Sequence, residues 1–329
     1  MTNLYNVPSD FREEMIYGYI AANSRTIERV PNASGIMIAG GAPKGKVSVL
    51  TGGGSGHYPT FFGMVGKGLA TGAAIGEIFT SPSTEQIYRC TKAIDGGAGV
   101  LYVVGNYNGD VMNFGMAETR CQRENINIRT VIVTDDVAVE NIEDRRGIAG
   151  LFFVMKTAGA SAARGDDLAT VAEYAQRANA RTRSFGIAFA GCTIPGKTEP
   201  LFSVEAGKME LGLGIHGEPG IEITDLLPAR DIAALLVNKV MANAPVDVGS
   251  RAVVMLNGLG ATKYEELFVL YGDIHKQLQT AGIEVCETLI DEFATSLDMK
   301  GCSLTLLWVD DDLKALYDAP ASTPVYTKA

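Results

Sequence analysis

The sequence has little positive charge and few histidines. Its 329 residues include 28 lysines and arginines against 38 aspartates and glutamates, which gives a net charge of −10. This balance argues against a protein that binds nucleic acid through the phosphate backbone, although it does not exclude a local phosphate site. Only three histidines are present, His57, His216 and His275.

Paired cysteine motifs, an apolar leader and long apolar runs are also missing. The five cysteines lie far apart with no Cys-x-x-Cys pair, as expected for buried small side chains in a reducing compartment. The first twenty residues contain charged side chains in place of a signal-peptide core, and no segment is long enough to cross a bilayer. We therefore expect a cytoplasmic protein without membrane contact.

Glycine is abundant, at 38 positions, and hydrophobic residues make up 47% of the chain. Segments that predict strands alternate with segments that predict helices, which indicates α/β layers. We expect two α/β domains, each a mixed or mainly parallel sheet flanked by helices. The boundary is placed near Arg181 to Ser184. Residues 1–182 form an N-terminal domain with a glycine-rich loop and Asp110, and residues 183–329 form a C-terminal domain carrying His216.

Apolar runs and turn residues predict the individual elements. The expected strands lie at 46–50, 100–104, 128–133, 186–190, 209–216, 252–256 and 304–309. The expected helices lie at 10–24, 83–93, 114–125, 147–163, 166–180, 229–242 and 262–280.

Residues 208–220 form the segment around which the chain is organised, and they read Lys-Met-Glu-Leu-Gly-Leu-Gly-Ile-His-Gly-Glu-Pro-Gly. Alternating apolar residues predict a strand that ends at His216, with Gly212 and Gly214 clearing the face on which the imidazole lies. A core histidine before a turn is the alternative. The two glycines favour a ligand site.

A second glycine-rich stretch, residues 51–60, ends a predicted strand and places His57 at its end. Its backbone N–H groups are accessible to a ligand. The stretch misses the dinucleotide-binding fingerprint, because the third glycine would have to fall at His57. Residues 40–47 nearly match a phosphate-binding loop, but Val47 occupies the position that needs Ser or Thr, so a turn is expected.

Asp110 follows Asn108-Gly109, a pair that predicts a turn between a strand and a helix. A role at a ligand site and a helix-capping or turn carboxylate are both open for it. His275 lies beside the apolar stripe of the helix at 262–280 and is expected on the solvated surface.

Six motifs occur in one order along the chain: Gly-Gly-Gly-Ser-Gly-His at 52–57, Gly-Glu-Ile-Phe-Thr-Ser-Pro at 76–82, Asn-Tyr-Asn-Gly-Asp at 106–110, Gly-Ile-His-Gly-Glu-Pro-Gly at 214–220, Asn-Gly-Leu-Gly-Ala-Thr at 257–262 and Thr-Ser-Leu-Asp-Met at 295–299. Together they resemble the substrate-binding K subunit of dihydroxyacetone kinases. The resemblance covers almost the whole chain.

This resemblance implies the roles of three side chains. The histidine matching His216 bonds to the ketone carbon of the substrate and forms a hemiaminal, which selects carbonyl compounds over glycerol. The aspartate matching Asp110 is a general base for the terminal hydroxyl. The histidine matching His57 hydrogen-bonds the substrate and steadies the transferring phosphoryl group.

The remaining implied contacts come from the backbone at Gly53 and Gly54, which would hold the small polyol, and from Ser81, which would line the pocket. Neither a metal nor a cofactor is expected on this chain, and the run 310–312 of three aspartates is expected to start a helix. The family carries ATP or ADP with magnesium on a separate L subunit or domain. An L-type partner and a homodimer are therefore expected, with either ATP or a phosphotransferase relay as the donor.

Three departures from the family pattern bear on the substrate. Tyr58 stands where Glu is often found, Gly105 stands where Lys is common, and residues 220–251 form a shorter stretch than usual. A four-carbon ketose such as erythrulose thus becomes an alternative to dihydroxyacetone. Two other functions compete: a ketose-binding regulator or co-activator without catalysis, and a nucleotide-dependent oxidoreductase, which rests only on the glycine loops.

Overall fold

The computed structural model describes residues 3–329, which divide into two compact units. We call them the N-terminal unit, with residues 5–133, 151–179 and 312–329, and the C-terminal unit, with residues 3–4, 134–150 and 180–311. The predicted boundary at 182/183 lies close to residues 179 and 180, where the chain passes from the N-terminal to the C-terminal unit. However, residues 134–150 precede this boundary and belong to the C-terminal unit, and residues 312–329 follow it and belong to the N-terminal unit. Pairing of Asp136 with Ser184 explains the first exchange.

The N-terminal unit is built on a six-stranded mixed sheet in the order β1-β2-β4-β3-β5-β6. Strands β3 to β6 are parallel to one another, whereas β2 pairs antiparallel with both β1 and β4. The strands are β1 (Ile27–Arg29), β2 (Gly35–Ile38), β3 (Ser48–Ser55), β4 (Gly72–Ile78), β5 (Val100–Gly105) and β6 (Ile128–Val133). A short hairpin of β13 (Ala321–Ser322) and β14 (Thr327–Lys328) completes the unit.

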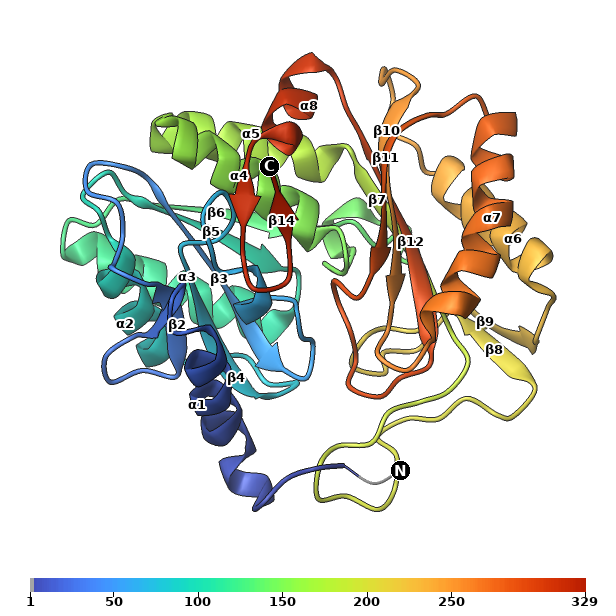
Figure 1. The fold of residues 1–329 in the computed structure, drawn as a ribbon, viewed down its shortest axis with the longest axis horizontal. Coiled ribbons are helices and arrows are strands. Elements are labelled where there is room, and N and C mark those ends of the chain that lie inside the picture. The colour runs from blue at the N-terminus through green and yellow to red at the C-terminus, as the bar shows by residue number, and fades with distance from the viewer. Residues whose placement is uncertain (1–2) are drawn as a thin grey trace. The chain divides into compact units, whose positions relative to one another are not determined.

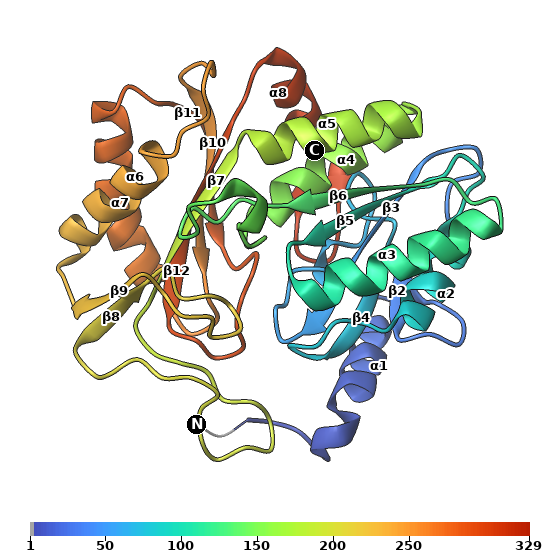
Figure 2. The same cartoon turned by 180° about the vertical axis from the view of Figure 1, so that it is seen from behind.

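Helices cover both faces of this sheet. Helices α2 and α3 pack together over one face, and α4 packs against β3 and β5 on the other (Figures 1 and 2). The helices are α1 (Phe11–Asn23), α2 (Thr84–Ile94), α3 (Asn108–Arg123), α4 (Leu151–Arg164), α5 (Leu168–Ala180) and α8 (Asp311–Asp318), with short 3₁₀ helices η1 (Pro8–Asp10) and η2 (Phe62–Met64). Tyr102 and Phe114 lie at the centre of the core between the sheet and α2 and α3.

The C-terminal unit contains a second six-stranded sheet in the order β11-β10-β12-β7-β8-β9, in which only β10 and β11 are parallel. Helices α6 (Ala229–Met241) and α7 (Tyr264–Thr280) cover one face (Figure 1). The strands are β7 (Thr182–Ala188), β8 (Lys208–Leu211), β9 (Glu222–Asp225), β10 (Arg251–Gly258), β11 (Glu284–Asp291) and β12 (Gly301–Trp308), with η3 (Ile142–Asp144) on residues 134–150. Two mixed sheets flanked by helices confirm the predicted fold class.

Three local predictions were wrong. The predicted strand at 209–216 ends at Leu211, because Gly212 adopts a φ of +72° and turns the chain out of the sheet. The glycine run at 52–54 continues strand β3 and does not form a loop. Asn108 and Gly109 form the first turn of helix α3, so they do not make a separate turn.

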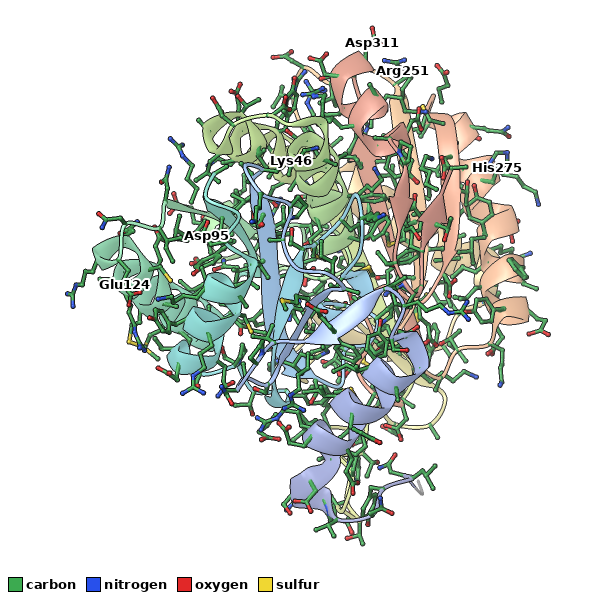
Figure 3. All side chains as sticks on the ribbon, turned by 60° about the vertical axis from the view of Figure 1, so that its left-hand side comes forward. Lys46, Asp95, Glu124, Arg251, His275 and Asp311 are labelled. Atoms are coloured by element: carbon green, nitrogen blue, oxygen red, sulfur yellow. The ribbon has the colours of Figure 1, made fainter. Side chains whose placement is uncertain are left out.

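His275 lies on the outer part of α7 (Figure 3) and is partly exposed, and its ring lies beside that of Tyr271 with centroids 6.0 Å apart. The predicted helix start at the acidic run is confirmed by α8, and Asp311 forms an ion pair of 2.6 Å with Arg251. Within residues 3–329, none of the helices has the length and apolar character required to span a membrane.

Candidate functional site

The carboxyl ends of three neighbouring parallel strands bring together five of the six predicted site residues. Gly53 and Gly54 lie in the last part of β3, and His57 follows two residues after that strand. Ser81 lies in the connection from β4 to α2, and Asp110 lies in the first turn of α3, directly after β5. Because β4, β3 and β5 are adjacent in the sheet, these residues share one edge, where ligand sites of α/β sheets concentrate.

His57 is buried and lies between two aromatic rings. Its imidazole stacks on Phe79 with ring centroids 4.7 Å apart and an interplanar angle of 24°. Phe61 presents its edge at 6.4 Å. Both phenylalanines have positive φ angles, +70° for Phe61 and +54° for Phe79, a conformation that is strained for a bulky side chain. The fold therefore accepts backbone strain on both sides of this imidazole and fixes its plane.

The glycines of β3 are required by close packing of the chain itself. A Cβ at Gly53 would lie 2.3 Å from the Phe61 ring, and one at Gly54 would lie 2.6 Å from the backbone nitrogen of Thr80. The Phe79 N–H donates to the Ser55 carbonyl at 3.0 Å, which ties the two strand ends together. The space that these glycines clear thus admits Phe61 and the segment after β4, and both stand beside His57.

Asp110 is a largely buried carboxylate near the N-terminus of helix α3, with 8% of its surface exposed. The same helix contacts the Ser81 segment, because Asn113 Nδ2 donates to Ser81 Oγ at 3.3 Å. Gly109 permits this approach, since its Cβ would lie 3.3 Å from Ser81 Cβ. The first turn of α3 therefore holds Asp110 and Ser81 on one framework.

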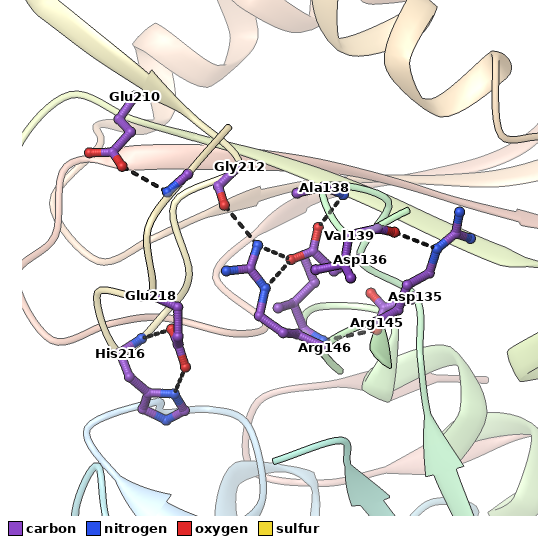
Figure 4. A network of polar contacts seen from close by, with 12 residues as sticks. Asp135, Asp136, Ala138, Val139, Arg145, Arg146, Glu210, Gly212, His216 and Glu218 are labelled. Atoms are coloured by element: carbon purple, nitrogen blue, oxygen red, sulfur yellow. Dashed lines mark hydrogen bonds and ion pairs between the residues drawn. The ribbon is translucent and has the colours of Figure 1, made fainter. Parts of the chain in front are cut away.

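His216 belongs to the C-terminal unit and lies in residues 212–220, which we call the His216 loop. Its Nδ1 lies 2.9 Å from Glu218 Oε1, and its backbone N–H donates to Glu218 Oε2 at 3.0 Å (Figure 4). The predicted open glycine face is absent. A Cβ at Gly214 would lie 2.0 Å from Glu218 Oε2, so this glycine makes room for a carboxylate.

The Glu218 carboxylate determines which ring nitrogen of a neutral His216 carries the proton. Burial alone would raise the pKa of Glu218, but the hydrogen bonds from His216 and, when the ring is protonated, its positive charge lower that pKa to about 2. An ionised carboxylate can only accept, so Nδ1 must be the protonated nitrogen of a neutral His216 ring. The lone pair of the neutral imidazole is then on Nε2.

Two further contacts fix the His216 loop to the C-terminal unit. Ser296 Oγ donates to the Ile215 carbonyl at 2.5 Å. The Gly220 N–H donates to Glu210 Oε1 at 2.8 Å, at the point where the loop leads toward β9 (Figure 4). Ser296 is one residue of the Thr-Ser-Leu-Asp-Met motif, so a motif 81 residues away in sequence supports the residue next to His216.

Sequence reasoning missed Glu218, Phe61 and Phe79 as parts of the site. Glu218 lies inside a motif that the sequence analysis used, but its contact with His216 depends on a reversal of the chain that was predicted as a straight strand. Phe79 also lies inside one of those motifs, at 76–82, whereas Phe61 lies in none of them. The positive φ of both residues could not be predicted, because that conformation is expected of glycine and not of phenylalanine. Across residues 3–329, histidine, cysteine and acidic side chains form no group that could hold a metal ion.

Comparisons with known proteins agree with the fold and with the motifs. The Dak1 domain family model matches residues 17–325. The D-erythrulose kinase of Mycolicibacterium smegmatis is 49% identical over 331 residues, which cover 100% of this chain and 57% of that protein. The dihydroxyacetone-binding subunit DhaK of the PTS-dependent dihydroxyacetone kinase 2 of Listeria innocua is 40% identical and is matched over 99% of both chains.

Solved structures give the same result. The dihydroxyacetone kinase of C. freundii superposes with a TM-score of 0.91 at 33% identity, over 100% of this chain and 61% of that one. A dihydroxyacetone kinase operon co-activator, Dha-DhaQ, superposes with a TM-score of 0.90 at 27% identity, over 96% of this chain and 98% of that one. The chain belongs to the Dak1 domain family, the family of the dihydroxyacetone-binding DhaK subunits. It spans little more than half the length of the erythrulose kinases that it matches.

Proposed function

We propose that this chain is the ketose-binding part of a short-ketose kinase and that it captures its substrate covalently through His216. The observation that carries the proposal is the contact of 2.9 Å between His216 Nδ1 and the ionised Glu218 carboxylate. It directs the lone pair to Nε2 and leaves a carboxylate beside the ring to offset positive charge. A nucleophile of this kind needs an electrophilic carbon, which a ketone has and a glycerol hydroxyl does not.

In the proposed capture step, Nε2 of His216 attacks the ketone carbon of the substrate. A carbon–nitrogen bond forms, the π electrons of the C=O bond move to oxygen, and the oxygen takes a proton from solvent to become the hydroxyl of a hemiaminal, which leaves the substituted imidazole ring positively charged. Positive charge develops on the imidazole while the new bond forms. The Nδ1–H bond to Glu218 offsets this charge, as a carboxylate does for an imidazolium in hydrolases.

In the proposed transfer step, Asp110 accepts the proton of the terminal hydroxyl as that oxygen attacks the γ-phosphoryl group. His57 hydrogen-bonds the substrate, with its ring orientation fixed by Phe79. The backbone of Gly53 and Gly54 and the Ser81 hydroxyl contribute further contacts. An L-type subunit or domain supplies the nucleotide and magnesium, and this chain binds neither.

The relatives support a four-carbon substrate. Both the D-erythrulose kinase at 49% identity and the L-erythrulose kinase of Pectobacterium atrosepticum at 45% are more similar to this chain than the DhaK subunit at 40%. Tyr58, which departs from the family pattern, is part of an aromatic cluster with Tyr19 and Phe62, at centroid distances of 5.9 and 5.1 Å. We therefore propose erythrulose as the substrate, with dihydroxyacetone as the three-carbon alternative.

The test is calorimetric titration of the purified chain with erythrulose, dihydroxyacetone and glycerol, repeated on His216→Ala. Binding of a ketose but not of glycerol, lost in the variant, is the expected result. Equal binding of glycerol, or unchanged ketose binding by the variant, would overturn covalent capture.

A ketose-binding co-activator is the second candidate, favoured by the likeness to Dha-DhaQ at 27% identity. The two functions differ in their need for a base. In a kinase supplied with an L-type partner and ATP, Asp110→Asn abolishes phosphate transfer and leaves ketose binding within about twofold. A wild-type chain that binds the ketose but never supports transfer with any L-type partner tested would favour the co-activator.

A further inference from the structure

A cluster of buried charges lies next to the His216 loop and has no part in the function proposed above. Residues 135, 136, 145 and 146 provide two carboxylates and two guanidinium groups, all at least nine-tenths buried (Figure 4). Asp136 and Arg146 form an ion pair of 2.7 Å with side-chain exposures of 3% and 10%. Desolvation largely cancels the stability gained from a buried ion pair. A pair of this kind therefore suggests a role in fixing one conformation.

Arg146 contacts the His216 loop at its first residue. Its Nη2 donates to the Gly212 carbonyl at 2.7 Å, and Gly212 is the residue whose φ of +72° turns the chain out of strand β8. A Cβ at Gly214 would lie 2.7 Å from Arg146 Nη1 and 2.0 Å from Glu218 Oε2. The guanidinium and the carboxylate that orients His216 thus approach the same backbone position.

Asp136 fixes the plane of that guanidinium. Its Oδ2 accepts from Arg146 Nε at 2.8 Å and lies 2.7 Å from Nη2. Its Oδ1 accepts the Ala138 N–H at 3.0 Å, so the carboxylate is itself held by the backbone (Figure 4). A planar guanidinium can bridge an aspartate and a carbonyl in this way, whereas the single ammonium of lysine cannot match the paired geometry.

We propose that Arg146, oriented by Asp136, is a positioning residue for the His216 loop: it fixes the turn at Gly212 and thereby the Glu218–His216 pair. This inference rests on the proposed function, because positioning matters only if His216 captures a ketose. The contact is important for the loop because it lies at Gly212, where the chain leaves strand β8. A rotation of the turn at Gly212 would displace both members of the pair that follow it.

Arg145 provides a matched control. It is the preceding residue, is 4% exposed, and also donates hydrogen bonds through its guanidinium. It donates to the Val139 carbonyl at 3.0 Å and to Asn243 Oδ1 at 2.8 Å, and neither acceptor belongs to the His216 loop. Arg145→Gln therefore removes an equally buried guanidinium from the same segment and leaves the contact with Gly212 in place.

The experiment compares Arg146→Gln with Arg145→Gln in the full chain. Both variants are expected to lower the thermal midpoint. Only Arg146→Gln is expected to raise the Kd for dihydroxyacetone and erythrulose, by about tenfold or more, by analogy with the loss of groups that orient metal-binding histidines. A Kd within about twofold of the wild type in a folded Arg146→Gln variant would overturn the proposal, as would equal losses in both variants.

A second readout does not depend on the ketose. The chain has three histidines, so the ring nitrogens of His216 can be assigned in a ¹⁵N-histidine spectrum by comparison with His216→Ala. We expect Arg146→Gln, but not Arg145→Gln, to shift these signals in the free protein. Unchanged signals in Arg146→Gln would overturn the positioning role, whether or not the wild type binds a ketose. Absence of ketose binding by the wild type would instead contradict the proposed function.

Asp136→Asn and Arg146→Lys keep the experiment decisive if Arg146→Gln does not fold. The first keeps the shape of the aspartate without its charge, and the second keeps a cation without the planar fork. Both are expected to weaken ketose binding in the same direction as Arg146→Gln and to shift the His216 ring signals. Wild-type affinity and unchanged ring signals in both variants would contradict the inference.

Discussion

Replacing Glu218 should weaken ketose capture by an amount that follows from its two hydrogen bonds to His216. Glu218→Gln keeps an oxygen acceptor near Nδ1 but removes the charge. A hydrogen bond to a charged acceptor contributes about 1.5–3 kcal/mol and one between neutral groups about 0.5–1.5 kcal/mol. The loss is therefore about 1–1.5 kcal/mol, which corresponds to a rise in Kd of about five- to tenfold.

Glu218→Ala removes both the bond to Nδ1 and the bond to the His216 backbone N–H. At the low end of the same range, the two bonds together contribute about 3 kcal/mol, so the Kd should rise by about 100-fold. Calorimetric titration measures the affinity. Carbon-13 spectra of dihydroxyacetone labelled at its carbonyl report directly whether the ketone carbon has become a hemiaminal.

Glu222→Gln is the control, because it removes the same charge from an exposed side chain four residues further on, in β9. It should bind ketoses as the wild type does. The reasoning is refuted if Glu218→Ala captures a ketose with wild-type affinity while His216→Ala does not. It is equally refuted if Glu222→Gln and Glu218→Gln lose the same affinity, since a general charge effect would then explain both.

Three further predictions concern other parts of the two units. Gly54→Ala should lower the free energy of unfolding by about 1–3 kcal/mol, the cost of an overpacked core, because the new Cβ would lie 2.6 Å from backbone. In the control Gly18→Ala, in α1, the new Cβ has no neighbour within 4 Å, so the change should be neutral or stabilising. Urea unfolding measures both variants. Phe79→Leu removes the ring stacked on His57, a contact that contributes about 1 kcal/mol. The rate of phosphate transfer, assayed with an L-type partner, should therefore fall by about fivefold. An unchanged rate would show that the stacking does not position His57. Burial raises the pKa of Asp136 from 3.8 to about 6, even though Arg146 opposes this rise. The folded state therefore holds this proton more tightly, and the wild type should lose stability relative to Asp136→Asn as the pH rises from about 4 to 6. Urea unfolding at pH 4 and 7 measures this change, and a difference that does not vary with pH would contradict it.

Continuous apolar runs made most of the fold predictable from the sequence. Strand β6 was predicted at its observed bounds, and β5 and α6 to within one residue, because their flanking turn residues agree with the apolar pattern. Strands β1, β2, β4, β9 and β11 were missed. Strands β1 and β9 are short and carry charged side chains such as Glu28 and Glu222, so period and apolarity give little signal there.

The sequence selects candidate residues for the site but does not give their geometry. His57, Asp110 and His216 were selected from their places at predicted strand ends. The glycines beside them could not be interpreted correctly, because a glycine that leaves room for a ligand and one that leaves room for the chain itself look the same in a sequence. Gly54 and Gly214 are of the second kind, and only the structure shows that the occupants are the segment after β4 and Glu218.

The contact between Arg146 and Gly212 lies beyond sequence reasoning for a different reason. It joins residues 66 positions apart and depends on a turn at Gly212, where the alternating pattern predicted a continuous strand. A buried arginine in isolation predicts nothing about the loop that it contacts.

Under the proposed function, recognition of the carbonyl is separate from recognition of substrate size. The proposed bond to His216 requires a ketone, and the groups proposed to tune it, Glu218 and Arg146, belong to the C-terminal unit. Tyr58 and Gly105, the two positions that depart from the family pattern, belong to the N-terminal unit. Changes at those positions can therefore alter the preference between three and four carbons without touching the nucleophile. A family that keeps one capture reaction could in this way serve several ketoses, because the hydrogen-bonding pocket is relieved of the harder task of rejecting polyols.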